Sequence, residues 1–208
     1  MLKVMYENDD PGLMTRVWAF RHRRFVEQMG WVELARDDHL ERDQFDTATA
    51  LHLVLQHDDE VIGYSRLLQT TGPHLVKELL PASVSPRCGP SNYEWSRCAI
   101  ARDLPLLSGL RAGDILMTGV LECLTAIGAN AVTFLTYPAV VRMMRRRGYP
   151  ACVIANITVA NGDDVQAVFS RLPAGLLARQ RQKAGIGHPL LTWGNAVSRL
   201  VGRESEAA

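Results

Sequence analysis

The sequence lacks the cysteine and hydrophobic patterns of zinc-binding, disulfide-rich or membrane proteins. Its four cysteines, Cys88, Cys98, Cys123 and Cys152, form no C-x-x-C pair and have no histidine at ligand spacing. No apolar run approaches the roughly 18 residues that a membrane-spanning helix needs. Acidic residues within the first ten positions are also atypical of a signal peptide. We therefore expect a reduced, cytoplasmic chain without a membrane span.

An excess of charge of either sign is also absent. The chain has 23 Lys and Arg against 22 Asp and Glu, which gives a formal net charge of +1. This balance predicts neither nucleic acid nor an anionic membrane surface as a partner. With 208 residues, of which 47% are hydrophobic, the chain is long enough to bury one sizeable core. We expect a single domain over residues 1–208.

Hydrophobic periodicity predicts that helices and strands alternate along the chain. Helices are expected over residues 13–29, 74–80, 109–127 and 139–147. Strands are expected over residues 50–56, 61–68, 93–101, 131–136 and 151–159. Between the first helix and the first strand, residues 32–49 are acid-rich and without period, which predicts a long loop. We expect the tail from Gly194 onward to be frayed.

The order of these elements predicts the fold class. The first two strands are joined by four polar residues and resemble a hairpin, whereas the later strands are connected through helices. This order is typical of a mixed sheet with helices on both faces, an α/β sandwich of three αβα layers. The strands over 93–101 and 131–136 are separated by a whole helix, so they could lie parallel and splay apart at one end. A cleft there would suit an acyl chain or a cofactor.

Charged residues recur in the first half of the chain, within segments that otherwise resemble a core. They lie beside aromatic and aliphatic residues at 21–25, 31, 41–46, 63–66 and 93–97. Burying a charge is costly unless it is paired or used. The pattern therefore predicts a polar site within the folded core. Glu94 and Arg97 would point to opposite faces of a regular strand, so we expect a β-bulge there.

Five short motifs follow one another with near-constant spacing. They read RHRRF at 21–25, MGW at 29–31, LERDQFD at 40–46, GYSRLLQTT at 63–71 and EWSR at 94–97. Together they resemble the acyl-homoserine-lactone synthases of the LuxI type, over residues 20–150. The resemblance implies the fold of the GNAT N-acetyltransferases. It also implies transfer of an acyl group from a thioester to the amine of S-adenosylmethionine, then lactonisation and release of methylthioadenosine.

The resemblance carries the family's site onto particular residues of this sequence. Its hallmark positions match Arg21, Phe25, Trp31, Asp43, Asp46, Arg66, Glu94 and Arg97, and weaker positions match Glu41 and Ser96. All except Glu94, Glu41 and Ser96 are assigned to S-adenosylmethionine binding. The implied catalytic residues are Glu94, Asp43 and Arg97, without a metal or a cofactor, since S-adenosylmethionine and the thioester are substrates.

The chemistry explains why these residue types are needed. The amine of S-adenosylmethionine is protonated near neutral pH, so a carboxylate must remove a proton; Glu94 is the first choice and Asp43 the second. Acids suit the sulfonium and amine, arginine suits the substrate carboxylate, and Trp31 and Phe25 offer aromatic faces. Alternatively, the charges form a structural ion-pair network. Phe25 is more readily explained by core packing, and Trp31 fits either role.

The acyl pocket and the carrier-binding surface are expected in the second half of the chain. The pocket residues would be Ile100, Leu116, Met117, Val120, Phe134, Thr136, Met143 and Ile154, which are ordinary core residues otherwise. Arg142, Arg145, Arg146 and Arg147 would bind an acyl carrier protein or the phosphates of coenzyme A, or would simply be a solvated helix end. Trp95 stands where an aliphatic residue is usual in the family.

Two other functions compete with the synthase hypothesis. A generic GNAT acyltransferase that uses acyl-coenzyme A would need a Gly-rich pyrophosphate loop, and residues 107–113 hold glycines without its clean spacing. A non-catalytic binding module would have lost charges that are all present here. The six histidines, His22, His39, His52, His57, His74 and His188, show no catalytic or metal spacing, so surface or packing roles are expected for them.

Overall fold

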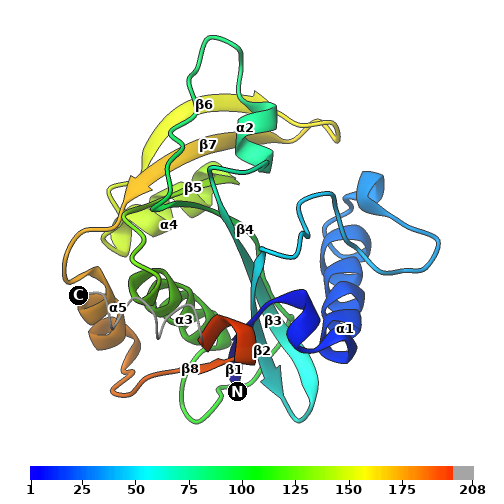
Figure 1. The fold of residues 1–208 in the computed structure, drawn as a ribbon, viewed down its shortest axis with the longest axis vertical. Coiled ribbons are helices and arrows are strands. Elements are labelled where there is room, and N and C mark those ends of the chain that lie inside the picture. The colour runs from blue at the N-terminus through cyan, green and yellow to red at the C-terminus, as the bar shows by residue number, and fades with distance from the viewer. Residues whose placement is uncertain (199–208) are drawn as a thin grey trace.

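The computed structural model describes residues 1–198, which build a mixed sheet with helices on both faces (Figure 1). Within this range the strands are β1 Leu2–Met5, β2 Leu51–His57, β3 Glu60–Gln69, β4 Asn92–Ile100, β5 Ala131–Thr136, β6 Cys152–Thr158, β7 Asp164–Arg171 and β8 Leu191–Trp193. The helices are α1 Pro11–Arg21, α2 Leu75–Leu79, α3 Ala112–Ala126, α4 Pro138–Arg146 and α5 Leu176–Ala184. The strand order is β6-β7-β5-β4-β3-β2-β1-β8. None of these helices is long and apolar enough to cross a membrane.

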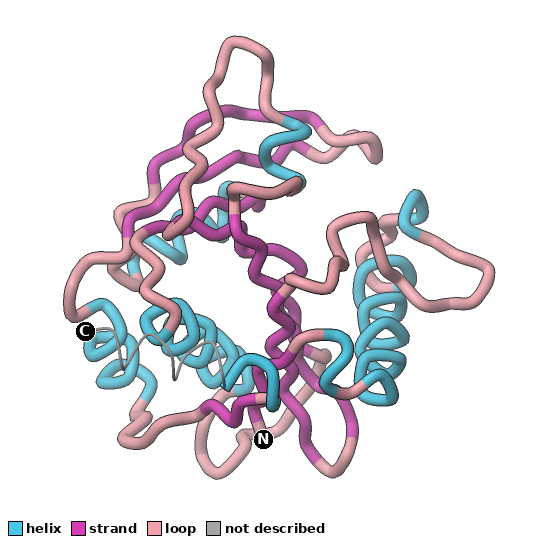
Figure 2. The backbone as a smooth tube through the Cα atoms, in the orientation of Figure 1, coloured by secondary structure: helices cyan, strands magenta, loops and turns pink. Residues whose placement is uncertain are grey.

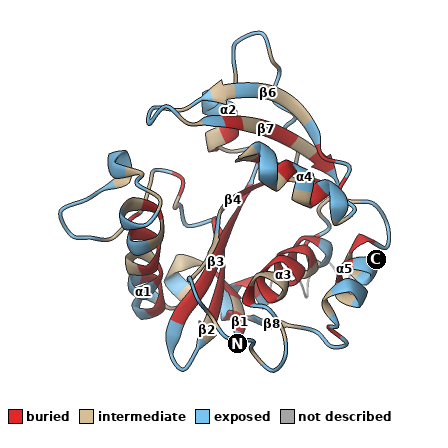
Figure 3. Ribbon diagram, turned by 180° about the vertical axis from the view of Figure 1, so that it is seen from behind, coloured by how far each residue is buried: buried red, intermediate tan, exposed pale blue. Residues whose placement is uncertain are grey.

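The predicted α/β sandwich is confirmed, and its two largest buried clusters lie on opposite faces of the sheet. On one face, α1 contributes Leu13 and Val17 to a buried cluster with Tyr64 of β3. On the other face, α3 and α4 contribute Val120 and Val141 to a larger buried cluster. Figure 3 shows this burial along the central strands and the inward sides of α1 and α3. The sheet is thus covered on both faces near its centre.

Local sequence explains most of the element boundaries. The hairpin between β2 and β3 turns at Asp58 and Asp59, which both have positive φ, 47° and 62°, as a two-residue hairpin turn requires. The helix predicted over 109–127 begins later, at Ala112. Ser108 and Gly109 take positive φ, 49° and 81°, in a tight turn closed by the Leu107–Leu110 bridge, which is incompatible with a helix.

The first helix departs from the predicted continuous run over 13–29. It is α-helical through Arg21 and then widens into a six-residue π-helical segment, η2, from His22 to Glu27. The segment begins directly after the buried Arg21 and contains the buried Phe25. A π-helical turn inside a helix is rare and often found at functional sites.

The fraying expected at the end of the chain is wrong in part, and the structure has several elements that the sequence did not predict. Fraying from Gly194 is wrong for residues 194–198, because residues 195–198 are helical and Val197 is fully buried in the main core. The remainder of the predicted frayed tail lies outside the described residues. Strands β1, β7 and β8 and helix α5 were not predicted; β7 pairs with the whole length of β5.

Both special features predicted for the central strands are confirmed. Strand β4 pairs in parallel with β5 only from Asn92 to Glu94, after which the two strands separate (Figure 2). The pairing of β4 with β3 shifts register between Tyr64 and Arg66. Opposite that shift Arg97 adopts a positive φ of 53°, which marks a β-bulge. The bulge brings Arg97 to the same face of the sheet as Glu94.

Candidate active site

Six charged side chains converge where α1, the acid-rich loop and strands β3 and β4 meet. They are Arg21, Glu41, Asp43, Asp46, Arg66 and Arg97, and we call them the charged network. None exposes more than 11% of its side chain. Three arginines balance three carboxylates, so the network as a whole is neutral. Its burial is tolerable only because each charge is paired.

Arg21 and Arg66 use all their donor nitrogens within the protein. Arg21 Nε donates to Glu41 Oε2 at 2.5 Å, and its two terminal nitrogens donate to Asp46 and Glu41 at 2.8 and 3.0 Å. Arg66 donates to both oxygens of Asp43 at 2.6 and 3.1 Å, to Asp46 at 2.7 Å and to Ser96 Oγ at 3.2 Å. These two arginines therefore hold the carboxylates in place.

The arginines of the network lower the pKa of two of its carboxylates. Burial alone would raise the pKa of Asp46, but Arg21 and Arg66 outweigh it and hold that pKa well below its ordinary value. Burial would also raise the pKa of Glu41, and Arg97 and Arg21 reverse it. Glu41 and Asp46 therefore stay ionised over the whole physiological pH range.

Arg97 lies at the edge of the charged network that is nearest to Phe25 and Trp31. Its Nη2 donates to Glu41 at 3.1 Å and to Asp43 at 2.9 Å, whereas its Nη1 donates to no described residue. Its guanidinium carbon lies 5.6 Å from the centre of the Phe25 ring. Phe25 is buried and stacks on the partly exposed Trp31, with ring centres 5.2 Å apart. Arg97 and Trp31 therefore lie where the network approaches solvent.

Glu94 is a buried carboxylate, and only one of its two oxygens accepts a hydrogen bond from a described residue. It is 1% exposed, its Oε2 accepts a 2.7 Å hydrogen bond from the Val76 N–H of α2, and its Oε1 is buried without a partner among the described residues. Burial raises the pKa of Glu94 above its ordinary value, although the Val76 N–H and the charge of Arg66 act in the opposite direction. A raised pKa and an unpaired oxygen suit a general base.

A buried histidine–tyrosine pair lies behind the network, and the packing role expected for a histidine of this sequence is what His52 has here. His52 Nδ1 lies 2.7 Å from the Tyr64 hydroxyl, which accepts a 3.5 Å hydrogen bond from Arg21 Nη1. Burial lowers the pKa of His52 to about 4, so its ring is neutral near pH 7. Tyr64 lies within the GYSR motif, but His52 gave no signal because its contact depends on the register of β2 against β3.

The predicted acyl-pocket residues fall into different parts of the core. Val120, Met117 and Phe134 belong to one buried cluster, against which Met143 packs. Trp95 lies in the same cluster, 6.3 Å from Phe134 between ring centres. Another predicted residue, Leu116, belongs to a separate cluster, against which the partly buried Ile100 packs. Two others are partly exposed and belong to no core cluster, Thr136 and Ile154.

The four arginines at the end of α4 are not equivalent. Arg147 forms a 2.7 Å ion pair with Asp114 of α3, and Arg145 Nε donates to the Ala151 carbonyl at 2.9 Å. Arg142 and Arg146 are exposed and lie one helical turn apart. These two are therefore the better candidates for contact with an acyl carrier.

A family model and a curated relative both match this chain to autoinducer synthases. The family model described as autoinducer synthase matches residues 5–181. An acyl-homoserine-lactone synthase from Ralstonia nicotianae is 31% identical over 167 residues, which cover 76% of this chain and 82% of that protein.

Solved structures confirm the fold. A CoA-dependent acyl-homoserine lactone synthase, BjaI, solved with SAM and isopentyl-CoA, is 22% identical with a TM-score of 0.82, covering 96% of this chain and 98% of the other. A putative N-acetyltransferase from Lactobacillus plantarum is 20% identical with a TM-score of 0.57, covering 83% of this chain and 98% of the other. The GNAT-like fold expected from the resemblance is therefore confirmed.

Proposed function

Because the chain belongs to the autoinducer synthase family, we propose that Glu94 and the charged network form the active site of its acyl-homoserine-lactone synthesis. The reaction transfers the acyl group of a thioester, on acyl carrier protein or coenzyme A, to the amine of S-adenosylmethionine. Lactonisation then releases methylthioadenosine. The observation that carries the proposal is the buried Glu94 carboxylate, with one oxygen anchored and the other available.

Glu94 acts as the general base in this scheme. Oε1 accepts a proton from the ammonium group of S-adenosylmethionine, and the resulting amine attacks the thioester carbonyl carbon. Collapse of the tetrahedral intermediate forms the amide and expels the thiolate, which takes up a proton. Backbone N–H groups near the point where β4 and β5 separate are the candidate donors to the oxyanion. The substrate carboxylate then closes the lactone by displacing the sulfonium as methylthioadenosine.

The charged network divides into residues that touch substrate and residues that position them. Arg97 binds the substrate carboxylate through its available Nη1. Asp43 interacts with the cationic end of the substrate, and Trp31 and Phe25 face the sulfonium and adenine. Three residues are saturated by internal bonds and act as positioning residues, Arg21, Asp46 and Arg66.

The acyl chain occupies the side of the sheet that carries α3. Trp95 and Phe134 lie there, in the same cluster as Met117 and Val120, and Met143 packs against it. The exposed Arg142 and Arg146 attract the acidic carrier protein or the phosphates of coenzyme A. Beyond its two substrates the enzyme uses no metal or cofactor for the chemistry, and it works in the cytoplasm.

The test is a mass-spectrometric assay of the purified protein with S-adenosylmethionine and parallel panels of acyl-carrier-protein and acyl-coenzyme A thioesters. The expected products are an acyl-homoserine lactone and methylthioadenosine. Glu94→Gln and Asp43→Asn identify the base, and Glu60→Gln, at the exposed start of β3, is the matched control. Acylation of simple amines without lactone formation would instead support a generic acyltransferase. Binding of S-adenosylmethionine without any turnover would support a binding module.

A further inference from the structure

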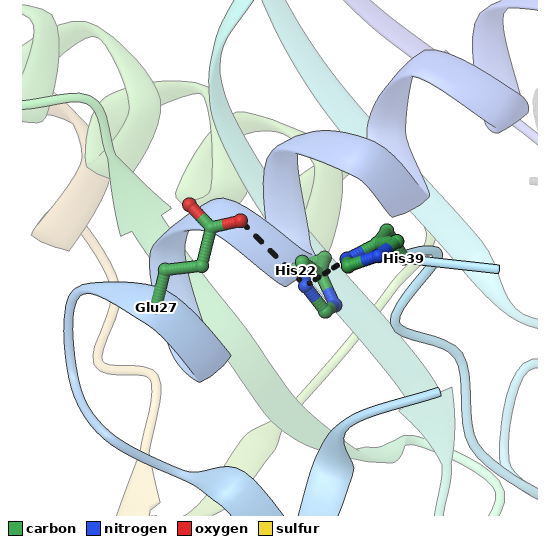
Figure 4. A group of neighbouring side chains, drawn as sticks. All are labelled: His22, Glu27 and His39. Carbon is green, nitrogen blue, oxygen red and sulfur yellow. Dashed lines mark hydrogen bonds and ion pairs between the residues drawn. The ribbon is translucent and has the colours of Figure 1, made fainter. Parts of the chain in front are cut away.

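Three side chains that could bind a metal ion lie close together outside the charged network. His22, at the start of η2, Glu27, at its end, and His39, in the acid-rich loop, point toward one another (Figure 4). His39 Nδ1 lies 3.1 Å from His22 Nε2, which lies 3.6 Å from Glu27 Oε1. All three ligand atoms lie within 4.8 Å of one another. The proposed catalytic scheme uses none of these residues.

The π-helical geometry of η2 creates the first half of this cluster. In an α-helix, two residues five positions apart point about 140° away from each other. In a π-helix the hydrogen bonds run between residues five apart, as from Gln28 N to Arg23 O at 3.1 Å, so such residues lie one above the other. The widened turn therefore places Glu27 beside His22, which a continuous α-helix would not do.

The acid-rich loop supplies the third group by turning back onto the helix. His39 has a positive φ of 54°, in a turn where its N–H donates to the Arg36 carbonyl at 3.0 Å. Two residues later the Glu41 N–H donates to the Trp18 carbonyl of α1 at 3.1 Å. The His39 ring meets the His22 ring edge-on, with centres 4.9 Å apart. The loop is thus directed onto His22 by its backbone.

The donor set and spacing match those of a zinc ion. Two imidazoles and a carboxylate are typical zinc ligands, and ligand atoms in a tetrahedral zinc site lie about 3.3 Å apart. The distances of 3.1 and 3.6 Å lie on either side of that value. His22 Nδ1 is buried without a partner among the described residues, so it can carry the ring proton while Nε2 presents its lone pair to the ion. Glu27 and His39 are exposed, which leaves room for a water ligand.

We propose that His22 Nε2, His39 Nδ1 and the Glu27 carboxylate bind a zinc ion, with water as the fourth ligand. The ion would bridge η2 and the acid-rich loop, close to the hydrogen bond from the Glu41 N–H to the Trp18 carbonyl. His39 lies two residues from Glu41, so the bridge would fix the backbone that presents the network to S-adenosylmethionine. The inference goes beyond the synthase activity and does not depend on it.

The test is titration of the metal-free, full-length protein with Zn²⁺ alone, against a chromogenic zinc indicator. The exposed thiols are blocked first, because Cys88, Cys98 and Cys152 could bind zinc on their own. We expect one ion per chain. We also expect a rise of a few degrees in the melting temperature at saturating zinc, which a chelator reverses.

Two variants and a control decide the outcome. Glu27→Gln keeps the shape of the side chain, and His39→Asn keeps a residue that tolerates positive φ, so both should fold. Each should weaken zinc binding at least tenfold and abolish the rise in melting temperature. His57→Asn, at an exposed histidine of the β2–β3 hairpin, should bind like wild type. Absence of stoichiometric binding, or equal binding by wild type and both ligand variants, would overturn the proposal.

Discussion

The backbone N–H of Val76 donates a 2.7 Å hydrogen bond to Glu94 Oε2, so the first turn of α2 fixes the orientation of a carboxylate on β4. The other oxygen of that carboxylate is buried without a partner among residues 1–198. The Glu94 carboxylate is therefore held in place through Oε2, and Oε1 is left to accept a proton. This division follows from the contact between two residues that lie 18 positions apart in the sequence, on α2 and β4.

Glu94→Gln should lower kcat by about 10²–10⁴-fold, which is the usual contribution of a positioned base. Glutamine keeps the shape and an oxygen that accepts from Val76, so the affinity for S-adenosylmethionine should change little. Stopped assays of lactone formation and calorimetric titration of S-adenosylmethionine separate the two effects. A variant that turns over normally would show that Asp43 or water is the base.

The same substitution should change how stability depends on pH. Because burial raises the pKa of Glu94 in the folded state, its ionisation destabilises the fold as pH rises from the ordinary value of 4.5 through the raised pKa. Glu94→Gln removes this loss. Urea unfolding should therefore show the variant gaining stability relative to wild type as pH rises above about 4.5, until the raised pKa of Glu94 is passed. A difference that is constant with pH would contradict the raised pKa.

Asp46→Asn should destabilise the fold by about 3–5 kcal/mol, because it leaves Arg21 and Arg66 buried with too little compensating charge. The pKa of Asp46 is lowered in the folded state, so its contribution is present above its ordinary pKa of 3.8 and is lost as pH falls through the lowered value. Urea unfolding at pH 7 measures the loss. Asp59→Asn, in the exposed hairpin turn, should have almost no effect.

Gly119→Ala should destabilise the protein by about 1–3 kcal/mol, although alanine is the better helix former. A Cβ at Gly119 of α3 would lie 2.0 Å from Leu2 Cδ2, and Leu2 is itself buried between the helix and the sheet. Gly113→Ala, in the same helix, meets only Ile100 Cδ1 at 3.5 Å and should be neutral or stabilising. Thermal unfolding of the pair tests the close approach of α3 to β1.

Phe134→Leu should shift the acyl preference toward longer chains, because it removes ring volume beside Trp95 in the proposed pocket. One methylene in a hydrophobic pocket typically changes kcat/KM by about 10–200-fold. The measurement is kcat/KM across a series of acyl thioesters. Phe169→Leu, on β7 and outside the core clusters, should leave the preference unchanged. If both variants changed the acyl preference in the same direction, the effect of Phe134→Leu on the pocket would be indirect.

Reversing the charge of Arg142 and Arg146 together should raise the KM for the acyl thioester and leave the affinity for S-adenosylmethionine unchanged. The two exposed side chains lie on one side of α4, and their attraction for an acidic carrier should weaken with salt. Arg16→Glu, on the exposed face of α1, is the control. An unchanged KM for both the carrier-protein and coenzyme A donors would assign these arginines to a solvated helix end.

Several features of the site could be predicted from the sequence because they depend on local pattern. Successive side chains of a regular strand point to opposite faces, so Glu94 and Arg97 could not share one face of a regular β4. This conflict predicted the bulge that the structure has. The whole helix between the predicted strands likewise predicted the parallel, partly separated pairing of β4 and β5. The later elements, including β7, went unpredicted, although β7 completes the pairing of β5.

The sequence by itself determined which chemical groups are present and in which order, since the motifs that carry Arg21, Glu41, Asp43, Arg66 and Arg97 are read directly from it. Only the tertiary structure decided which of these charges are saturated and which donor is left available. It also decided that the first helix widens to a π-helical turn, which places Glu27 and the distant His39 beside His22. The physical reason is that periodicity encodes contacts within one element, whereas strand register and helix pitch are set by packing between elements distant in sequence.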